Sequence, residues 1–138
     1  MAMTDPDGAL GPGATVTPRG LPGGVLRRVL EHIDANRHRE LRLPELSALA
    51  HMSVFHFARL FKQSMGISPH RFAVGRRIDR AKEMLVTDRT SIAAIAQAVG
   101  FRTPSHFTTV FRHATGVTPS VYRSAAQASP AQATAPGA

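Results

Sequence analysis

Cysteine and tryptophan are absent from this chain of 138 residues, and tyrosine occurs once. Without cysteine the chain has no disulfide, no thiol nucleophile and no zinc site of the cysteine type. No apolar run approaches the roughly 18 residues that a membrane-spanning helix needs. The first 20 residues lack the basic-then-apolar pattern of a secretory signal. These absences favour a cytoplasmic protein with no membrane partner.

Acidic residues are scarce and unevenly distributed. The chain has 17 Lys and Arg against 9 Asp and Glu, which gives a net charge of +8. No acid occurs between Glu45 and Asp79 or after Asp88, although arginines occur in both stretches. Such a basic surface favours the binding of a polyanion, above all nucleic acid. A membrane surface is a weaker alternative because the apolar stripes are needed for a core, and a soluble protein with a basic face is another.

Signatures of catalysis and of cofactor binding are also missing. The sequence contains no nucleophile elbow, no P-loop and no dinucleotide-binding glycine pattern. None of its 7 histidines forms a His-x-x-x-His pair, and no carboxylate cluster lies near them. We therefore expect no catalytic residue, no metal, no cofactor and no enzymatic activity. A chain this short also leaves no room for a small-molecule pocket beside its core.

One segment of the chain is present twice. The first copy contains His56-Phe57, Phe61-Lys62, Gly66-Ile67-Ser68-Pro69 and Phe72, and the second contains His106-Phe107, Phe111-Arg112, Gly116-Val117-Thr118-Pro119 and Tyr122. All these matches share the offset that separates His56 from His106. Earlier matches, such as Met52 with Phe101, are one position closer, so a turn absorbs one extra residue before Thr103. Two copies are too few for a solenoid and indicate a duplicated structural unit.

Apolar periodicity and capping residues predict an all-α fold of about seven helices. Ser53, Ser68, Thr103 and Thr118 are N-cap residues by type and position, and Gly66 is suited to end a helix. The expected helices are 22–37, a short one from 44, 54–65, 69–86, 92–99, one from 104 to near 116, and one from 119. The last is expected to turn Val121, Tyr122 and Ala125 inward.

Each copy is a short helix, a tight turn and a longer helix with a polar cap, which is the helix-turn-helix plan. The expected organisation is two helix-turn-helix subdomains, 21–66 and 88–126, joined by a long linker helix, 67–87, with disordered tails 1–20 and 127–138. A linker helix of about 18 residues is about 27 Å long. Recognition helices in successive major grooves lie roughly 34 Å apart, so a helix of this size suits the spacing.

The segment from about Leu43 to Arg123 carries an ordered set of motifs. They are Phe57-x-x-Leu60-Phe61-Lys62, Gly66-x-Ser68-Pro69, Arg76-Arg77-x-x-x-Ala81, Ile95-Ala96-x-x-x-Gly100-Phe101, His106-Phe107, Phe111-Arg112, Gly116-x-Thr118-Pro119 and Tyr122-Arg123. The set resembles the DNA-binding domain of the AraC/XylS family of bacterial transcription regulators. The resemblance implies a nucleoid-associated regulator that binds double-stranded DNA and most often activates by touching RNA polymerase.

The resemblance places base-reading positions on the second helix of each copy. In the first copy they are Phe55, Ala58 and Arg59, and the planar guanidinium of Arg59 suits guanine O6 and N7. In the second copy the corresponding exposed positions include Ser105, His106 and Thr109. Many family members have arginine at the position of Thr109. The second copy is therefore expected to be the weaker reader of bases.

Other positions are expected to contact phosphates or to hold the fold. Lys62 and Arg112 occupy the same place in the two copies as phosphate clamps, and Ser53 and Thr103 place helix N-termini against phosphates. Alternatives stay open at three places. Phe55 is either a DNA contact or a partly buried core aromatic, and His106 is either a contact or a solvent-exposed histidine. For Arg76, Arg77 and Arg80 a structural role is favoured for two of the three.

Two rivals to a complete DNA-binding regulator remain. One is a non-catalytic basic helical module that binds protein or RNA, although RNA is disfavoured because only Phe55 looks exposed for stacking. The other is a DNA-binding fragment of a larger ligand-sensing regulator.

Overall fold

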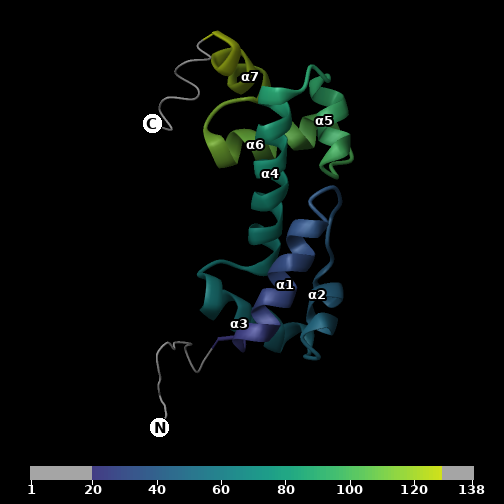
Figure 1. Cartoon of the computed structure of the whole chain (residues 1–138), viewed down its shortest axis with the longest axis vertical. Helices are drawn as coiled ribbons and strands as arrows, with labels where there is room; N and C mark the ends of the chain where they lie inside the picture. Colours follow the sequence, from purple (N-terminus) through teal and green to yellow (C-terminus); the bar gives the residue numbers. More distant parts are fainter. Residues whose placement is uncertain (1–19, 129–138) are drawn as a thin grey trace. The chain divides into compact units, whose positions relative to one another are not determined.

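The computed structural model of the protein describes residues 20–128 (Figure 1). The helices are α1 (Gly23–Ala35), α2 (Leu43–Leu49), α3 (Val54–Met65), α4 (Pro69–Thr87), α5 (Ile92–Ala98), α6 (Pro104–Thr115) and α7 (Pro119–Ala128). No strand occurs within 20–128, and the all-α prediction is confirmed. Most of the two expected tails lies outside the described residues, but Gln127 and Ala128 belong to α7.

The predicted capping residues begin and end the helices. Ser53 and Thr103 precede α3 and α6, and their hydroxyl oxygens accept hydrogen bonds from the N–H groups of His56 (3.2 Å) and His106 (3.0 Å). Ser68 and Thr118 cap α4 and α7 in the same way, each at 3.2 Å. The α3 helix ends at Gly66, whose φ of +85° lies in the left-handed region that glycine adopts without a steric cost.

The chain divides into two compact units. Unit 1 comprises the described residues up to Ala35 together with Leu41–Ala73, and unit 2 comprises Asn36–Glu40 with the residues from Val74 onward. Helix α4 therefore begins in unit 1 and continues into unit 2. Each unit contains one short helix, one turn and one recognition-type helix, so each is described separately.

The core of unit 1 is built around two phenylalanines of α3. Phe57 and Phe61 are fully buried, and their ring centroids lie 5.8 Å apart. Val29 and Ile33 of α1, Leu46 of α2 and other apolar residues pack around them. Phe72 of α4 meets Phe61 edge to face at 5.7 Å. Phe57 and Phe61 therefore define the face that α3 buries.

The core of unit 2 repeats this plan with α6. Phe107 and Phe111 are fully buried with ring centroids 5.7 Å apart, and Tyr122 of α7 packs edge-on against Phe111 at 5.5 Å. Around them lie Ile78, Ala81 and Leu85 of α4, Ile95 and Ala96 of α5, and Val99 and Phe101 of the following turn. The aromatic rings of α6 and α7 and the apolar face of α5 thus form one continuous core.

The inward face predicted for α7 is wrong at two positions. Val121 is 52% exposed and Ala125 is also exposed, whereas Pro119 is buried. Helix α7 is held by Tyr122 and by Arg123, whose guanidinium donates to the carbonyl oxygens of Leu85 and Asp88, each at 3.0 Å. Because these contacts fix one side of a short helix, Val121 is left facing solvent.

Arg76, Arg77 and Arg80 of α4 each have a side-chain partner within the protein. Arg77 is only 6% exposed, and its guanidinium donates to the carbonyl oxygens of Val99 and Gly100, both at 2.8 Å. The same guanidinium lies 4.2 Å from the ring centroid of Phe101. Burial lowers the pKa of Arg77, and the Glu40 carboxylate opposes that shift.

Arg76 and Arg80 form ion pairs with acidic residues of the same helix, α4. Arg76 pairs with Asp79 at 2.8 Å and Arg80 with Glu83 at 3.0 Å. The hydrogen bond from Arg80 is the main reason that the pKa of Glu83 lies below its ordinary value. Of the three, Arg77 has the structural role that was expected for two of them, and for Arg76 and Arg80 that role stays a prediction.

The two helix-turn-helix turns have the same hydrogen bonds but different residues. Met52 N–H donates to Ser47 O at 3.1 Å, and Phe101 N–H donates to Ala96 O at 2.9 Å. The residue before each donor has positive φ: His51 at +55° and Gly100 at +86°. After these matched turns unit 2 has one additional residue before its cap, which is Arg102. The predicted one-residue insertion therefore lies in the turn.

Candidate nucleic-acid interface

Helix α3 exposes the first-copy positions that the sequence assigned to base reading. Phe55 is 89% exposed, Arg59 is exposed and Ala58 is half-buried. The alternative of Phe55 as a core aromatic is wrong, because Phe57 and Phe61 already occupy the inward face of α3. A phenylalanine so fully in water at the start of a helix is available to contact a partner.

Arg59 is not free on this surface. Its Nη2 lies 3.2 Å from Nδ1 of His56, one helical turn earlier, and both side chains are exposed. Positions three apart on a helix lie side by side, so the pair occupies one face of α3. The sequence gave no sign of this contact.

The phosphate-side residues of α3 lie at its two ends. Lys62 is exposed in the last turn, and within the described residues it makes no ion pair. Ser53 is exposed at the N-cap, but its hydroxyl and carbonyl oxygens accept from the N–H groups of His56 and Phe57. The N–H groups of Val54 and Phe55 precede the first intrahelical bond and point out of the helix end.

Helix α6 also exposes its second-copy positions. Ser105, His106 and Thr109 are all exposed, as are Thr103 and Pro104 at its start. The His106 ring meets the Phe101 ring edge-on with centroids 5.4 Å apart. His106 is therefore a histidine open to solvent on one side and packed on the turn on the other.

Two predicted contact residues of α6 share one hollow. Thr109 and Arg112 line it together with Thr108 and His113. These side chains offer hydroxyl, guanidinium and imidazole groups, and none of them is acidic. The structure thus places Thr109, one of the predicted base-reading positions of the second copy, beside the predicted phosphate clamp Arg112.

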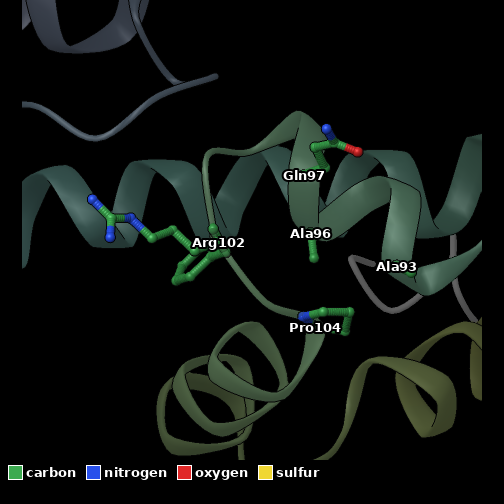
Figure 2. Close-up of a pocket in the computed structure, with 6 residues that line it drawn as sticks. Ala93, Ala96, Gln97, Arg102 and Pro104 are labelled. Atoms are coloured by element: carbon green, nitrogen blue, oxygen red, sulfur yellow. The ribbon is translucent and has the colours of Figure 1, made fainter.

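A second hollow lies between α5 and the start of α6. Its lining residues are Ala93, Ala96, Gln97, Phe101, Arg102 and Pro104, and Figure 2 shows Arg102 in the turn that leads to Pro104. Arg102 is exposed. Sequence reasoning did not single it out as a contact residue. The signal was nevertheless present, because Arg102 is the residue inserted in the second copy.

Charge on both recognition-type helices has one sign. Neither α3 nor α6 contains an acidic residue, and α3 carries Arg59 and Lys62 while α6 carries Arg112. Within 20–128, no group of three or more His, Asp or Glu is placed to hold a metal ion. In the same range no helix is both long and apolar enough to cross a membrane. Each unit therefore presents a basic helix face above a phenylalanine core.

Known proteins are similar to this chain in sequence and in fold. Residues 46–125 match a family model described as a helix-turn-helix domain. The regulatory protein PocR of Salmonella typhimurium is 36% identical over 98 residues, which are 71% of this chain and 32% of PocR. The chain spans about a third of the length of the curated relatives it matches.

Solved structures agree with the family match. The DNA-binding domain of AdpA, solved in complex with a target DNA, has a TM-score of 0.73 and 30% identity, with 78% of this chain and 96% of that one covered. An AraC-type regulator from Chromobacterium violaceum has a TM-score of 0.69 and 28% identity, covering 73% and 90%. This chain belongs to the AraC/XylS family of transcription regulators, and it contains the family's double helix-turn-helix DNA-binding domain.

Proposed function

We propose that this chain binds double-stranded DNA in a sequence-specific manner and regulates transcription, with α3 and α6 as its two recognition helices. The observation that carries the proposal is the exposed, acid-free face of the second helix in each helix-turn-helix unit. That face displays Phe55 and Arg59 in unit 1 and Thr109 and Arg112 in unit 2. The solved AdpA domain, which is similar to this chain, was crystallised with its target DNA.

In unit 1, Arg59 is the principal base-reading residue. A guanidinium can donate two parallel hydrogen bonds to guanine O6 and N7 in the major groove, which is worth roughly 1–3 kcal/mol of discrimination. Phe55 lies four positions earlier and contacts a thymine methyl group or a sugar. Ala58 is small and half-buried, so it lets the helix approach the base edges closely.

In unit 2, the base-reading positions are Ser105, His106 and Thr109, and their chemistry is weaker. Two hydroxyl groups and an imidazole make single hydrogen bonds, whereas none of the three offers a bidentate fork. Unit 2 therefore contributes mostly phosphate contacts and recognition of DNA shape.

Phosphates are bound by side chains and by helix starts. Lys62 and Arg112 act as clamps, and Arg102 joins them from the inserted turn of unit 2. Ser53 and Thr103 shape the helix starts through oxygens that accept from His56 and His106, and each hydroxyl keeps its O–H to donate to a phosphate. The outward N–H groups are then those of Val54, Phe55 and Ser105, since Pro104 has none.

The wider activity is part of the same proposal. The two recognition helices enter successive major grooves, the protein acts without catalysis in the cytoplasm at the nucleoid, and activation proceeds through contact with RNA polymerase. A DNA-binding part of a larger ligand-sensing regulator fits equally with the relatives, of whose length the chain spans about a third.

Fluorescence titration of the full chain against labelled duplexes tests the proposal. A duplex selected from a randomised pool should bind at least a hundredfold more tightly than an unrelated duplex, and its log affinity should fall linearly with log salt concentration. An RNA duplex of the same sequence serves as the control for a nonspecific basic module. Equal affinity for all three, or affinity independent of salt, would overturn the proposal.

A further inference from the structure

The two histidines at matching positions of the repeat make different contacts. His56 Nδ1 lies 3.2 Å from Arg59 Nη2 in unit 1. His106, at the corresponding position of unit 2, packs its ring against Phe101 instead, with centroids 5.4 Å apart. The corresponding partner position in unit 2 is Thr109, which has no guanidinium. One position of the repeat therefore has two distinct surroundings.

The chemistry of the His56 contact fixes the state of the imidazole. A guanidinium has five N–H donors and no acceptor, so Arg59 donates and Nδ1 of His56 accepts. In this contact Nδ1 supplies the accepting lone pair, and the ring hydrogen is on Nε2. One of the two hydrogens on Arg59 Nη2 is used in this bond. The other, together with those of Nη1, still forms the fork that a guanine O6 and N7 pair accepts.

We propose that His56 is the positioning residue that aims Arg59 at its base, an inference that rests on the proposed DNA-binding function. An exposed arginine samples many rotamers, and binding must then immobilise it at an entropic cost. The hydrogen bond from Arg59 to His56 restricts the guanidinium before DNA arrives and reduces that cost. His56 therefore sets the sequence preference of unit 1 through Arg59 rather than by touching a base.

The repeat supplies a matched control for this proposal. His106 has the same residue type and the same place after its cap, and its N–H donates to Thr103 just as that of His56 donates to Ser53. It has no arginine to aim. Removal of His106, itself a proposed base-reading residue, should change discrimination only at base pairs bound by unit 2, while removal of His56 should weaken it at the base pair read by Arg59.

The experiment measures discrimination, which is the ratio of Kd for a duplex with one base pair changed to Kd for a duplex selected by the wild-type chain from a randomised pool. Full-length variants Arg59→Ala, His56→Ala, His56→Asn, His106→Ala and the double variant His56→Ala with Arg59→Ala are compared at every base pair. Asparagine is the rescue variant because its side-chain oxygen can occupy the place of Nδ1. Thermal melts accompany each variant, and no change is expected because His56 is exposed.

At the base pair whose discrimination Arg59→Ala abolishes, His56→Ala should reduce discrimination roughly three- to tenfold, and His56→Asn should restore most of it. The double variant should equal Arg59→Ala alone. If His56→Ala retains full discrimination there, the proposal is overturned while DNA binding stands. If His56→Asn fails to rescue, the positioning role is overturned. If the loss falls on a different base pair, His56 contacts a base itself and the positioning role is also overturned. If the wild-type chain shows no preference at all, the proposed function fails and the inference fails with it.

Discussion

The two units share a scaffold and secure it differently. Each buries two phenylalanines one turn apart, and in each the turn before the recognition helix has the same backbone hydrogen bond. Unit 2 alone holds that turn with a buried arginine, Arg77, and places a glycine, Gly100, at its left-handed position. Unit 1 has His51 at the equivalent place. The two units therefore have the same core but stabilise the turn with different residues.

The exposed faces of α3 and α6 also differ, and here unit 1 has the more elaborate side-chain chemistry. Unit 1 carries Arg59, braced by His56, on the face proposed to read bases, whereas unit 2 carries Thr109. The unit with the more elaborately fixed turn thus has the simpler recognition chemistry. The comparison suggests that unit 2 is chiefly an anchor and unit 1 chiefly a reader.

The largest expected effect comes from the buried phenylalanines that both units have in their cores. Phe61→Ala and Phe111→Ala should each lower the free energy of unfolding by about 3–5 kcal/mol, because each empties a fully buried site. Urea titration measures the loss, and hydrogen exchange shows where it falls. Phe61→Ala should raise exchange in unit 1 and Phe111→Ala in unit 2. Raised exchange in both units from either change would show that the two do not unfold separately.

Arg77 tests the fastening peculiar to unit 2. Arg77→Ala should cost roughly 2–4 kcal/mol, since one buried and one part-buried carbonyl oxygen lose a charged donor and Phe101 loses its stacked guanidinium. Arg80→Ala is the control, because it removes only an exposed ion pair. Equal losses for the two variants in thermal or urea unfolding would contradict a structural role for Arg77.

The two turns give opposite substitutions at matched positions. Gly100→Ala should cost about 1–3 kcal/mol, because φ is +86° and an added Cβ would lie 2.7 Å from the Cα of Arg39. His51→Gly should raise the free energy of unfolding by up to about 1 kcal/mol. The change removes roughly 1–2 kcal/mol of left-handed backbone strain but costs about 0.5–1 kcal/mol, because glycine has more conformational entropy in the unfolded state. Urea midpoints that move in the same direction for both variants would refute this account of the turns.

The reading faces can be exchanged in part. Arg59→Ala should lose roughly 1–3 kcal/mol of discrimination at one or two base pairs, and Thr109→Ala should lose much less. Thr109→Arg should add a new preference in the half of the site bound by unit 2. Binding measured across all single-base-pair variants of a selected duplex decides this. A larger loss from Thr109→Ala than from Arg59→Ala would reverse the assignment of reader and anchor.

The smallest effect should come from the phosphate clamps. Lys62→Ala, Arg112→Ala and Arg102→Ala should each weaken binding to all duplexes alike and reduce the slope of log affinity against log salt by about one. The slope is measured by titration at several salt concentrations. A change confined to particular base pairs would show that the residue reads bases instead.

Much of the fold was accessible from the sequence because its signals are local. Ser53, Thr103 and Gly66 act on the backbone within one turn of themselves, so their caps were predicted correctly. The phenylalanine stripe was also predictable, since helical spacing determines which side chains share a face. Val121 was not, because the side of a short helix that is buried depends on where Tyr122 and Arg123 anchor it.

Contacts across the fold were beyond the sequence. Arg77 lies 22 residues from the Val99 carbonyl oxygen to which it donates, and no pattern in the chain pairs them. The exposure of Phe55 depended on the core already being filled by its neighbours. The predicted roles of the exposed residues in DNA binding, and the division at 67–87 into a separate linker, stay predictions.

The amino-acid sequence by itself determined the duplicated all-α plan and the basic character of the helices, because these follow from spacing, capping and charge along the chain. The family was indicated by the resemblance of its ordered motifs. Tertiary structure alone decided that Arg77 fastens a turn, that Phe55 stands in water and that His56 holds Arg59. The first two depend on how separate segments pack. The third depends on the rotamers that two neighbouring exposed side chains adopt on a formed helix, which residue spacing permits but does not select.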